Sequence, residues 1–222
     1  MIRYQSFNRK DIKIGSISNR QHNLYISMIY ELNSNKNDMD KKFEEIAKRI
    51  ISAKDNKSSI ILMMGGHVIR SGVQKYLINL MEKGFISCLA MNGAGMIHDF
   101  EFALIGATTE NVARYIQEGQ FGLWQETGQI NDYLNQGYKK NLGIGETVGQ
   151  AIFEGDFPYK DISLLATGYR LKIPVTIHIG IGYDIIHEHP NCDGAATGAT
   201  SYRDFLYFTK IVENLEGGVV MN

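Results

Sequence analysis

Two glycine-containing turns follow apolar runs in this sequence and offer the chemistry of a phosphate site. The first turn is Gly65-Gly66-His67, after residues 59–64, and the second is Asn92-Gly93-Ala94-Gly95, after residues 85–91. Glycine lets the backbone approach a phosphate closely, and a following helix adds free N–H groups and the positive end of its dipole. The second turn lacks the third position of the full dinucleotide fingerprint, because His98 stands there. Tight turns without a ligand are the alternative interpretation.

Two side chains directly after the second turn can take part in chemistry. His98 has an imidazole whose ordinary pKa range allows proton transfer near neutral pH. Asp99 can accept hydrogen bonds from the hydroxyls of a ribose. The alternative for Asp99 is that its carboxylate only complements a helix dipole.

A third group of polar residues follows the apolar run 173–179, which contains His178. It consists of Asp184, His187, Glu188, His189, Cys192 and Asp193. These residue types bind metals, but no Cys-x-x-Cys or His-Glu-x-x-His pair accompanies them. A polar loop that binds a substrate or a partner is therefore favoured, and a metal-dependent hydrolase remains open. Trp124 is predicted to be a packing anchor at a helix end, with stacking on a ligand as the alternative.

The elements that position these residues alternate between helices and buried strands. Apolar runs predict strands, and apolar residues at helical spacing predict helices between them. Strands are expected at residues 59–64, 85–91, 173–179 and 218–221, and helices at residues 38–53, 68–83 and 201–215, with residues 108–172 mostly helical. The alternation predicts an α/β fold with a doubly wound, mostly parallel sheet built from βαβ units.

Composition narrows the class of protein further. The formal net charge of -1 predicts neither nucleic-acid binding nor attraction to an anionic membrane. The two cysteines, the lack of a signal-like N-terminus and the lack of a long apolar run predict a cytoplasmic protein. We expect one α/β domain over residues 1–222, with residues 1–37 poorly defined. Two alternatives remain for its C-terminal end: either the protein itself is short, or a C-terminal part is absent from this sequence.

The order and spacing of three segments resemble the deoxyhypusine synthase family, more closely its bacterial deoxyhypusine synthase-like members. The segments are residues 63–72, residues 92–99, and residues 173–220 through His187-Glu188-His189-Pro190, and the resemblance covers residues 59–222. It implies NAD bound on a Rossmann-like sheet and a homotetramer with active sites at subunit interfaces. It also implies that Asp99 stands at an acidic position of the cofactor and substrate site, and that Asp184 lies near acidic residues for cofactor and amine.

Our first functional hypothesis is an NAD-dependent transferase acting on a small amine. Hydride would leave a carbon next to nitrogen, and a second amine would trap the resulting imine. Residues predicted to hold the cofactor are Gly65, Gly66, His67, Asn92, Gly93, Ala94, Gly95 and Asp99, and the predicted catalytic residues are His98, His178 and Asp184. No metal is predicted. The alternative is a non-catalytic NAD-binding or assembly protein, because the sequence has no Trp-Gly-Lys to supply the family's imine-forming lysine.

Overall fold

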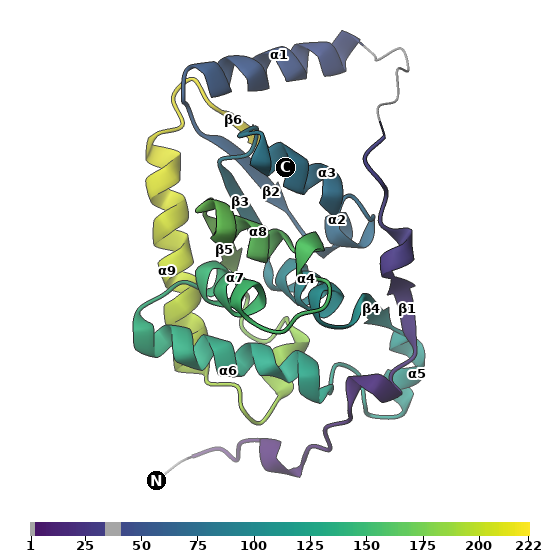
Figure 1. Cartoon of the computed structure of the whole chain (residues 1–222). Helices are drawn as coiled ribbons and strands as arrows, with labels where there is room; N and C mark the ends of the chain where they lie inside the picture. The colour runs from purple at the N-terminus through teal and green to yellow at the C-terminus, as the bar shows by residue number, and fades with distance from the viewer. Residues whose placement is uncertain (1–2, 34–40) are drawn as a thin grey trace.

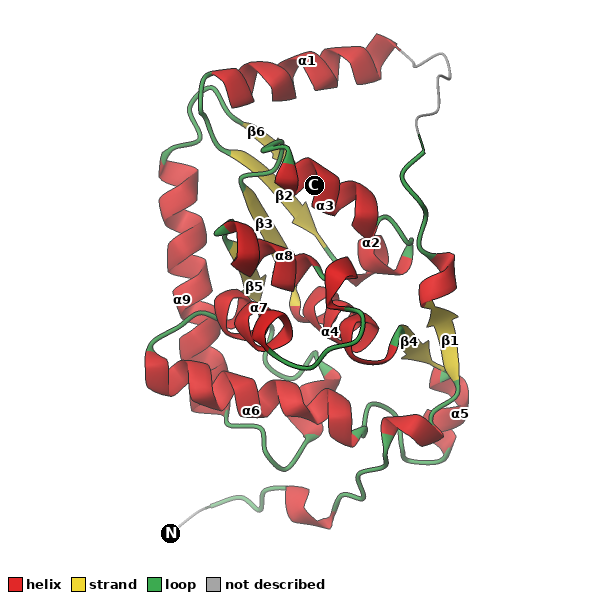
Figure 2. Cartoon of the chain, viewed as in Figure 1, coloured by secondary structure: helices red, strands yellow, loops and turns green. Residues whose placement is uncertain are grey.

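A four-stranded parallel sheet forms the centre of the computed structural model, which describes residues 3–33 and 41–222 (Figures 1 and 2). The strand order is β5-β3-β2-β6. The strands are β2 (Ile60–Met64), β3 (Cys88–Asn92), β5 (Val175–His178) and β6 (Val219–Met221). All three neighbouring pairs are parallel. The predicted α/β class, with a mostly parallel sheet, is confirmed, and each of the four predicted strands is present.

The direction in which the chain crosses the sheet reverses at β2. From β2 it passes through α2 (Gly66–Arg70) and α3 (Gln74–Glu82) to β3, and then onward to β5. Helix α9 (Gly194–Glu213) then returns the chain to β6, on the other side of β2. Because parallel crossovers are right-handed, the reversal puts helices on both faces of the sheet. In such sheets ligands bind outside the carboxyl ends of the strands, at the point of reversal.

The middle of the chain is mostly helical, as predicted, but it also contains an unpredicted strand. Its elements are α4 (Gly93–Ile105), β4 (Ala107–Glu110), α5 (Val112–Gln117), α6 (Gln125–Lys140), α7 (Ile144–Glu154) and α8 (Leu164–Leu171). Strand β4 pairs antiparallel with β1 (His22–Tyr25), so the N-terminal segment is held against the rest of the chain. Five short 3₁₀ helices complete the described elements: Arg9–Asp11, Ile17–Asn19, Ile26–Met28, Lys160–Ile162 and Ile185–Glu188.

The helix predicted over residues 68–83 is two helices, α2 and α3, because Gly72 breaks it. Gly72 has φ +80°, which favours glycine. A Cβ there would lie 2.6 Å from the Met28 carbonyl oxygen, and the Gly72 carbonyl accepts a hydrogen bond from the Tyr30 N–H. The apolar residues keep their helical spacing on both sides of this turn, which is why the sequence predicted one helix. The turn itself contacts the N-terminal segment.

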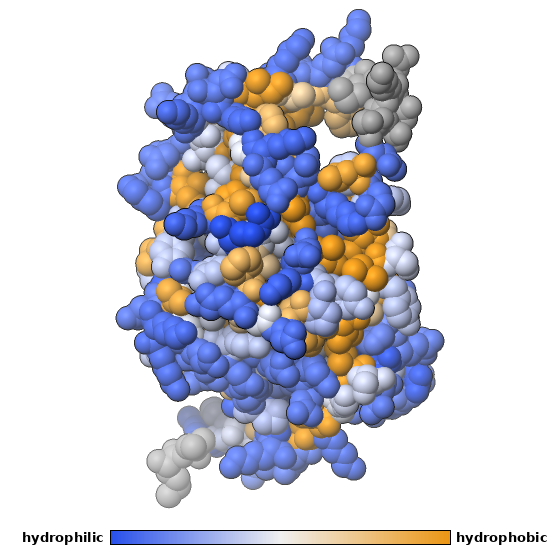
Figure 3. All heavy atoms as spheres, viewed as in Figure 1, coloured by the Kyte–Doolittle hydropathy of each residue, from blue (hydrophilic) through white to orange (hydrophobic). Residues whose placement is uncertain are grey.

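Helix α1 (Lys41–Asp55) lies beside β2 and β6 at the edge of the molecule (Figure 1). It confirms the predicted amphipathic helix, whose first three positions, residues 38–40, lie outside the described residues. Its apolar Phe43, Ile46 and Ile51 remain about half exposed. Figure 3 shows apolar surface beside this helix and further apolar patches elsewhere on the same face. Among the described residues, no helix combines the length and apolar character needed to cross a membrane.

Candidate functional site

The turn after β2 leaves backbone donors open at the carboxyl edge of the sheet. Gly65 precedes α2 in an extended conformation and has no side chain to cap it. Among the described residues, no acceptor is bonded to the N–H groups of Gly66 and His67. A Cβ on Gly66 would lie 2.8 Å from Cδ2 of His98, so only glycine lets that ring lie against the turn. This turn can accept an anionic or polar ligand group.

The turn after β3 is more occupied than the sequence predicted. The Asn92 side chain accepts a hydrogen bond from the Gly95 N–H at 3.0 Å and so caps α4. The Asp184 carboxylate lies directly against Gly93, in the space that a Cβ would fill. A phosphate at Gly93-Ala94-Gly95 would face this carboxylate, so the prediction of an open phosphate turn is corrected here. The turn after β2 is the better place for a phosphate.

A cavity of about 550 Å³ lies at the carboxyl ends of β3 and β5, and three predicted site residues meet in it. Asn92, His178 and Asp184 all line it, with further contributions from the loop after β5 and from α9. The Asn92 amide nitrogen also lies 3.3 Å from the place where a Cβ on Gly65 would stand. The Asn92 side chain therefore lies between the cavity and the open turn after β2.

The ionisable groups of this cavity have altered proton affinities. Burial raises the pKa of Asp184 to about 6, because an ionised carboxylate loses hydration there. Burial lowers the pKa of His178, whose Nε2 lies 3.0 Å from the Thr176 hydroxyl and whose ring meets the edge of Phe208. The cavity thus offers one carboxylate and one neutral imidazole to a ligand at neutral pH.

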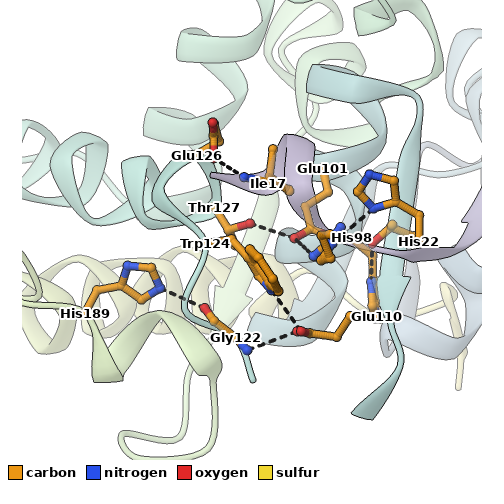
Figure 4. Close-up of polar contacts among 12 residues, drawn as sticks. Ile17, His22, His98, Glu101, Glu110, Gly122, Trp124, Glu126, Thr127 and His189 are labelled. Carbon is orange, nitrogen blue, oxygen red and sulfur yellow. Dashed lines mark hydrogen bonds and ion pairs between the residues drawn. The ribbon is translucent and has the colours of Figure 1, made fainter. Parts of the chain in front are cut away.

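His98 belongs to a buried polar network instead of this cavity (Figure 4). The network is centred on Glu101, which pairs with Arg20 through two contacts of 2.8 and 2.9 Å. Thr127 and Thr108 donate to the same carboxylate at 2.7 and 2.6 Å, and Nδ1 of His98 lies 2.8 Å from the Thr108 hydroxyl. Burial alone would raise the pKa of Glu101, but the Arg20 charge and these hydrogen bonds lower it.

Sequence reasoning missed Arg20, Glu101 and Thr108. Glu101 follows His98 by three positions on one helix, a spacing that places side chains on the same face. That spacing was the one available signal. Nothing in the sequence pattern indicates that Arg20 would pair with an acid 81 residues away.

Asp99 has a structural role, contrary to the prediction that it binds a ribose. It is 1% exposed. Its carboxylate accepts hydrogen bonds from the Ser163 hydroxyl at 2.6 Å and from the N–H groups of Leu164 and Leu165 at 2.8 and 3.1 Å. Burial raises its pKa to about 6, although these three bonds partly offset the rise. Asp99 therefore caps α8, a different helix from its own, and its burial keeps its carboxylate from a cofactor.

The segment from His187 to Asp193 does not gather into a metal site. His189 Nε2 lies 2.9 Å from the Gly122 carbonyl, and Asp193 accepts from the first N–H groups of α9. His187 accepts through Nδ1 from the Asp184 N–H. Within residues 3–33 and 41–222, no three histidine, cysteine or acidic side chains are grouped to hold an ion. These residues therefore offer no ready set of three ligands to a metal-dependent hydrolase.

Trp124 is a packing anchor at a helix end, as predicted. It precedes the first residue of α6 and is 2% exposed. Its indole N–H donates to Glu110 at 2.8 Å (Figure 4). Its ring packs edge to face with Tyr115. No face of this ring is open to a ligand base.

Comparison with known proteins identifies a family for this chain. A family model described as arginine dihydrolase ArgZ-like, C-terminal, Rossmann fold, matches residues 44–154, which is half of the chain. Among curated proteins the sequence finds no match.

Three similar solved structures support the fold. The apo structure of ArgZ, an arginine dihydrolase from the ornithine-ammonia cycle in cyanobacteria, is 17% identical, with a TM-score of 0.53 over 86% of this chain and 24% of that chain. A mutant of AgrE in binary complex with L-arginine is 15% identical, with a TM-score of 0.53 over 86% of this chain and 26% of that chain. A conserved LOR/SDH protein from Methanococcus maripaludis S2 is 15% identical, with a TM-score of 0.50 over 85% of this chain and 53% of that chain.

These matches show how much of each related protein the chain covers. The chain spans about a quarter of the length of ArgZ and AgrE and about half of the LOR/SDH protein. A protein from Entamoeba histolytica assigned as a deoxyhypusine synthase also matches, at 10% identity over 83% of this chain and 73% of that chain, but its TM-score of 0.48 is too low to support an argument. The predicted Rossmann fold is confirmed, whereas the resemblance to deoxyhypusine synthase in particular is not. By the match over half of its length, this chain belongs to the family of ArgZ-like C-terminal Rossmann-fold domains.

Proposed function

We propose that this chain binds NAD at the carboxyl end of β2 and acts on a small amine in the adjoining cavity. One observation carries the proposal: the Asn92 side chain lies between the open Gly65-Gly66 turn and the cavity that Asp184 lines. The turn also lies where the sheet reverses direction, the place where dinucleotides bind in doubly wound sheets. Cofactor and substrate would thus meet at one edge of the sheet.

The cavity residues match the needs of an amine substrate. The Asp184 carboxylate would hold a protonated amine by a charge-assisted hydrogen bond. The neutral imidazole of His178 would accept the proton that nitrogen must lose before the adjacent carbon can be oxidised. NAD, when bound, would take up the hydride from that carbon. The product is an imine, and transfer of its carbon group to a second amine is the finer form of this proposal.

A titration with NAD+ tests the cofactor half of the proposal. We expect binding heat, and a gain of about 2.7 kcal/mol in the free energy of unfolding at a hundredfold excess over Kd. L-arginine and L-ornithine serve as amine probes because both have been crystallised with AgrE, the latter together with NAD+. Spermidine is a third probe. Absence of both heat and stabilisation would remove the proposal, and binding without NADH formation would favour the non-catalytic alternative.

Because the pKa of Asp184 is raised, we expect amine binding to depend on pH. Its pKa is raised to about 6, so the ionised form that attracts an ammonium group predominates only above that pH. We expect amine affinity to rise as the pH increases through about 6 and then to level off. Asp184→Asn should weaken binding about tenfold to a hundredfold at neutral pH, the cost of a hydrogen bond to a charged group.

Calorimetric titrations between pH 5 and 8 measure this effect, with Asp161→Asn as the control, because Asp161 is an exposed acid that does not line the cavity. The Asp184 variant should lose the pH dependence, and the Asp161 variant should keep it. Equal amine affinity for wild type and Asp184→Asn would remove this carboxylate from the site. The homotetramer stays a prediction, for light scattering on the purified chain to test.

A further inference from the structure

The hydrogen bonds around His98 determine which of its two ring nitrogens carries the proton. Glu101 is ionised in its pair with Arg20 and can only accept hydrogen bonds. The Thr108 hydroxyl has a single proton, and it donates this proton to Glu101 at 2.6 Å. Thr108 therefore has only lone pairs left for His98. The 2.8 Å contact between them must be a donation from an N–H at Nδ1 of His98.

The other ring nitrogen, Nε2, is consequently the acceptor of a neutral imidazole. Burial lowers the pKa of His98 to about 4, and the nearby positive charges of Arg70, Arg20 and His67 lower it while Glu101 opposes them. The ring stays uncharged at neutral pH. This corrects the expectation that His98 transfers protons, because a group with so low a pKa is a weak base at neutral pH.

The ring of His98 lies against the open turn through Cδ2, the atom bonded to Nε2. Cδ2 lies 2.8 Å from the place of a Cβ on Gly66, next to the first turn of α2. Among the described residues, no donor bonds to Nε2. The glycine at position 66 lets the imidazole reach the same edge where the Gly66 and His67 N–H groups are open. The turn thus has open donors, and the ring that lies against it carries an acceptor nitrogen.

We infer that His98 accepts, through Nε2, a hydrogen bond from a hydroxyl or ammonium group of the ligand at the turn after β2, and that Thr108 and Glu101 are positioning residues that fix this tautomer. The ligand part of the inference rests on the proposed function, whereas the tautomer does not. An acceptor beside a row of donors would select a ligand that combines an anionic group with a hydroxyl or ammonium donor. A ligand that offers only anionic oxygens would meet a repelling lone pair.

Nitrogen spectra of the histidine rings test the tautomer in the whole protein without any ligand. In long-range ¹⁵N–¹H spectra of ¹⁵N-histidine-labelled protein, with His98→Gln to assign the signal, we expect a protonated Nδ1 and an unprotonated Nε2 from about pH 5 to about pH 8. Thr108→Val should move the population toward the Nε2–H form. Thr108→Ser should restore the wild-type spectrum. A wild-type ring with Nε2 protonated, or one that titrates near its ordinary pKa, would overturn the inference.

Thr127→Val is the matched control, because it removes a hydroxyl from the same Glu101 carboxylate without touching His98. It should leave the His98 tautomer unchanged. If it shifts the tautomer as much as Thr108→Val does, any disturbance of the network changes His98. Thr108 then has no specific positioning role.

The ligand arm adds NAD+ alone, L-ornithine alone and both together. A shift of the His98 Nε2 signal with NAD+ alone identifies a cofactor hydroxyl as donor, and a shift that requires L-ornithine identifies an ammonium. The Kd of that ligand should rise about tenfold in Thr108→Val and stay within about twofold in Thr108→Ser and Thr127→Val. Binding heat without any change at His98 overturns the inference and leaves the proposed function standing. No binding of either ligand overturns the proposed function and the ligand role of His98, while the spectrum of the free protein still decides the tautomer.

Discussion

Replacing Arg20 with methionine is expected to lower the free energy of unfolding by about 3–5 kcal/mol, the cost of leaving a buried charge without its partner. The side chains of Arg20 and Glu101 are 1% and 2% exposed. Glu101 would keep only the hydroxyls of Thr108 and Thr127, which carry no charge. In a chain of this length such a loss lowers the melting temperature by about 10 °C. Thermal and urea unfolding measure it.

Arg49→Met is the control for this effect. Arg49 forms an ion pair of similar length with Glu45, but both side chains are about two-thirds or more exposed. Exposed pairs of this spacing stabilise a helix by only about 0.3–0.5 kcal/mol. A second variant, Arg20→Met with Glu101→Gln, removes the orphaned charge and should recover part of the loss. Equal losses in the single and double variants would show that packing, and not charge, explains the effect.

The pH dependence of stability separates the charge from the packing. In the wild type the pKa of Glu101 is lowered, so its contribution to stability is present above its unfolded pKa and is lost as the pH falls through the folded value. Without Arg20, burial is the largest remaining influence and raises the pKa of Glu101. The variant therefore loses stability as the pH rises above the unfolded pKa. The gap between the two proteins should narrow toward acid pH, and a constant gap from about pH 4 to about pH 7 would contradict this account.

The sheet was predictable from sequence because its strands are short apolar runs, of which β3 and β5 are almost entirely buried. Strand β2 consists of five apolar residues. A continuous apolar run indicates a strand without any alternation of polar and apolar residues. The meeting of Asn92, His178 and Asp184 also follows from the parallel order, since β3 and β5 are neighbours and both end at the same edge. The pair of β1 with β4 was not predictable, because its four-residue strands are short and only partly apolar.

The two acids of α4 show where sequence reasoning stops. Asp99 and Glu101 are two positions apart, so on a helix they point to nearly opposite sides. Sequence alone does not say which side faces a ligand. The structure turns Asp99 toward α8 and Glu101 toward Arg20, so neither carboxylate contacts the cavity. Both partners come from distant parts of the chain.

Replacing Asp99 with alanine is expected to lower the free energy of unfolding by about 3–5 kcal/mol without weakening ligand binding. Three buried donors, on Ser163, Leu164 and Leu165, would lose their acceptor, and each unsatisfied donor costs about 1–3 kcal/mol. The Ser163 hydroxyl, which also accepts from the Ala166 N–H, would remain as the only cap of α8. Chemical unfolding measures the loss.

Asp193→Ala provides the comparison, because Asp193 also caps a helix with its carboxylate but is exposed to water. Water can replace the lost acceptor there, so the expected loss is about 1 kcal/mol. The two variants thus differ mainly in the burial of the cap. A ribose-binding Asp99 predicts the opposite pattern, with a normal melting temperature and a raised Kd for NAD+. Measuring NAD+ affinity below the melting temperature of each variant therefore decides between a helix cap and a cofactor ligand.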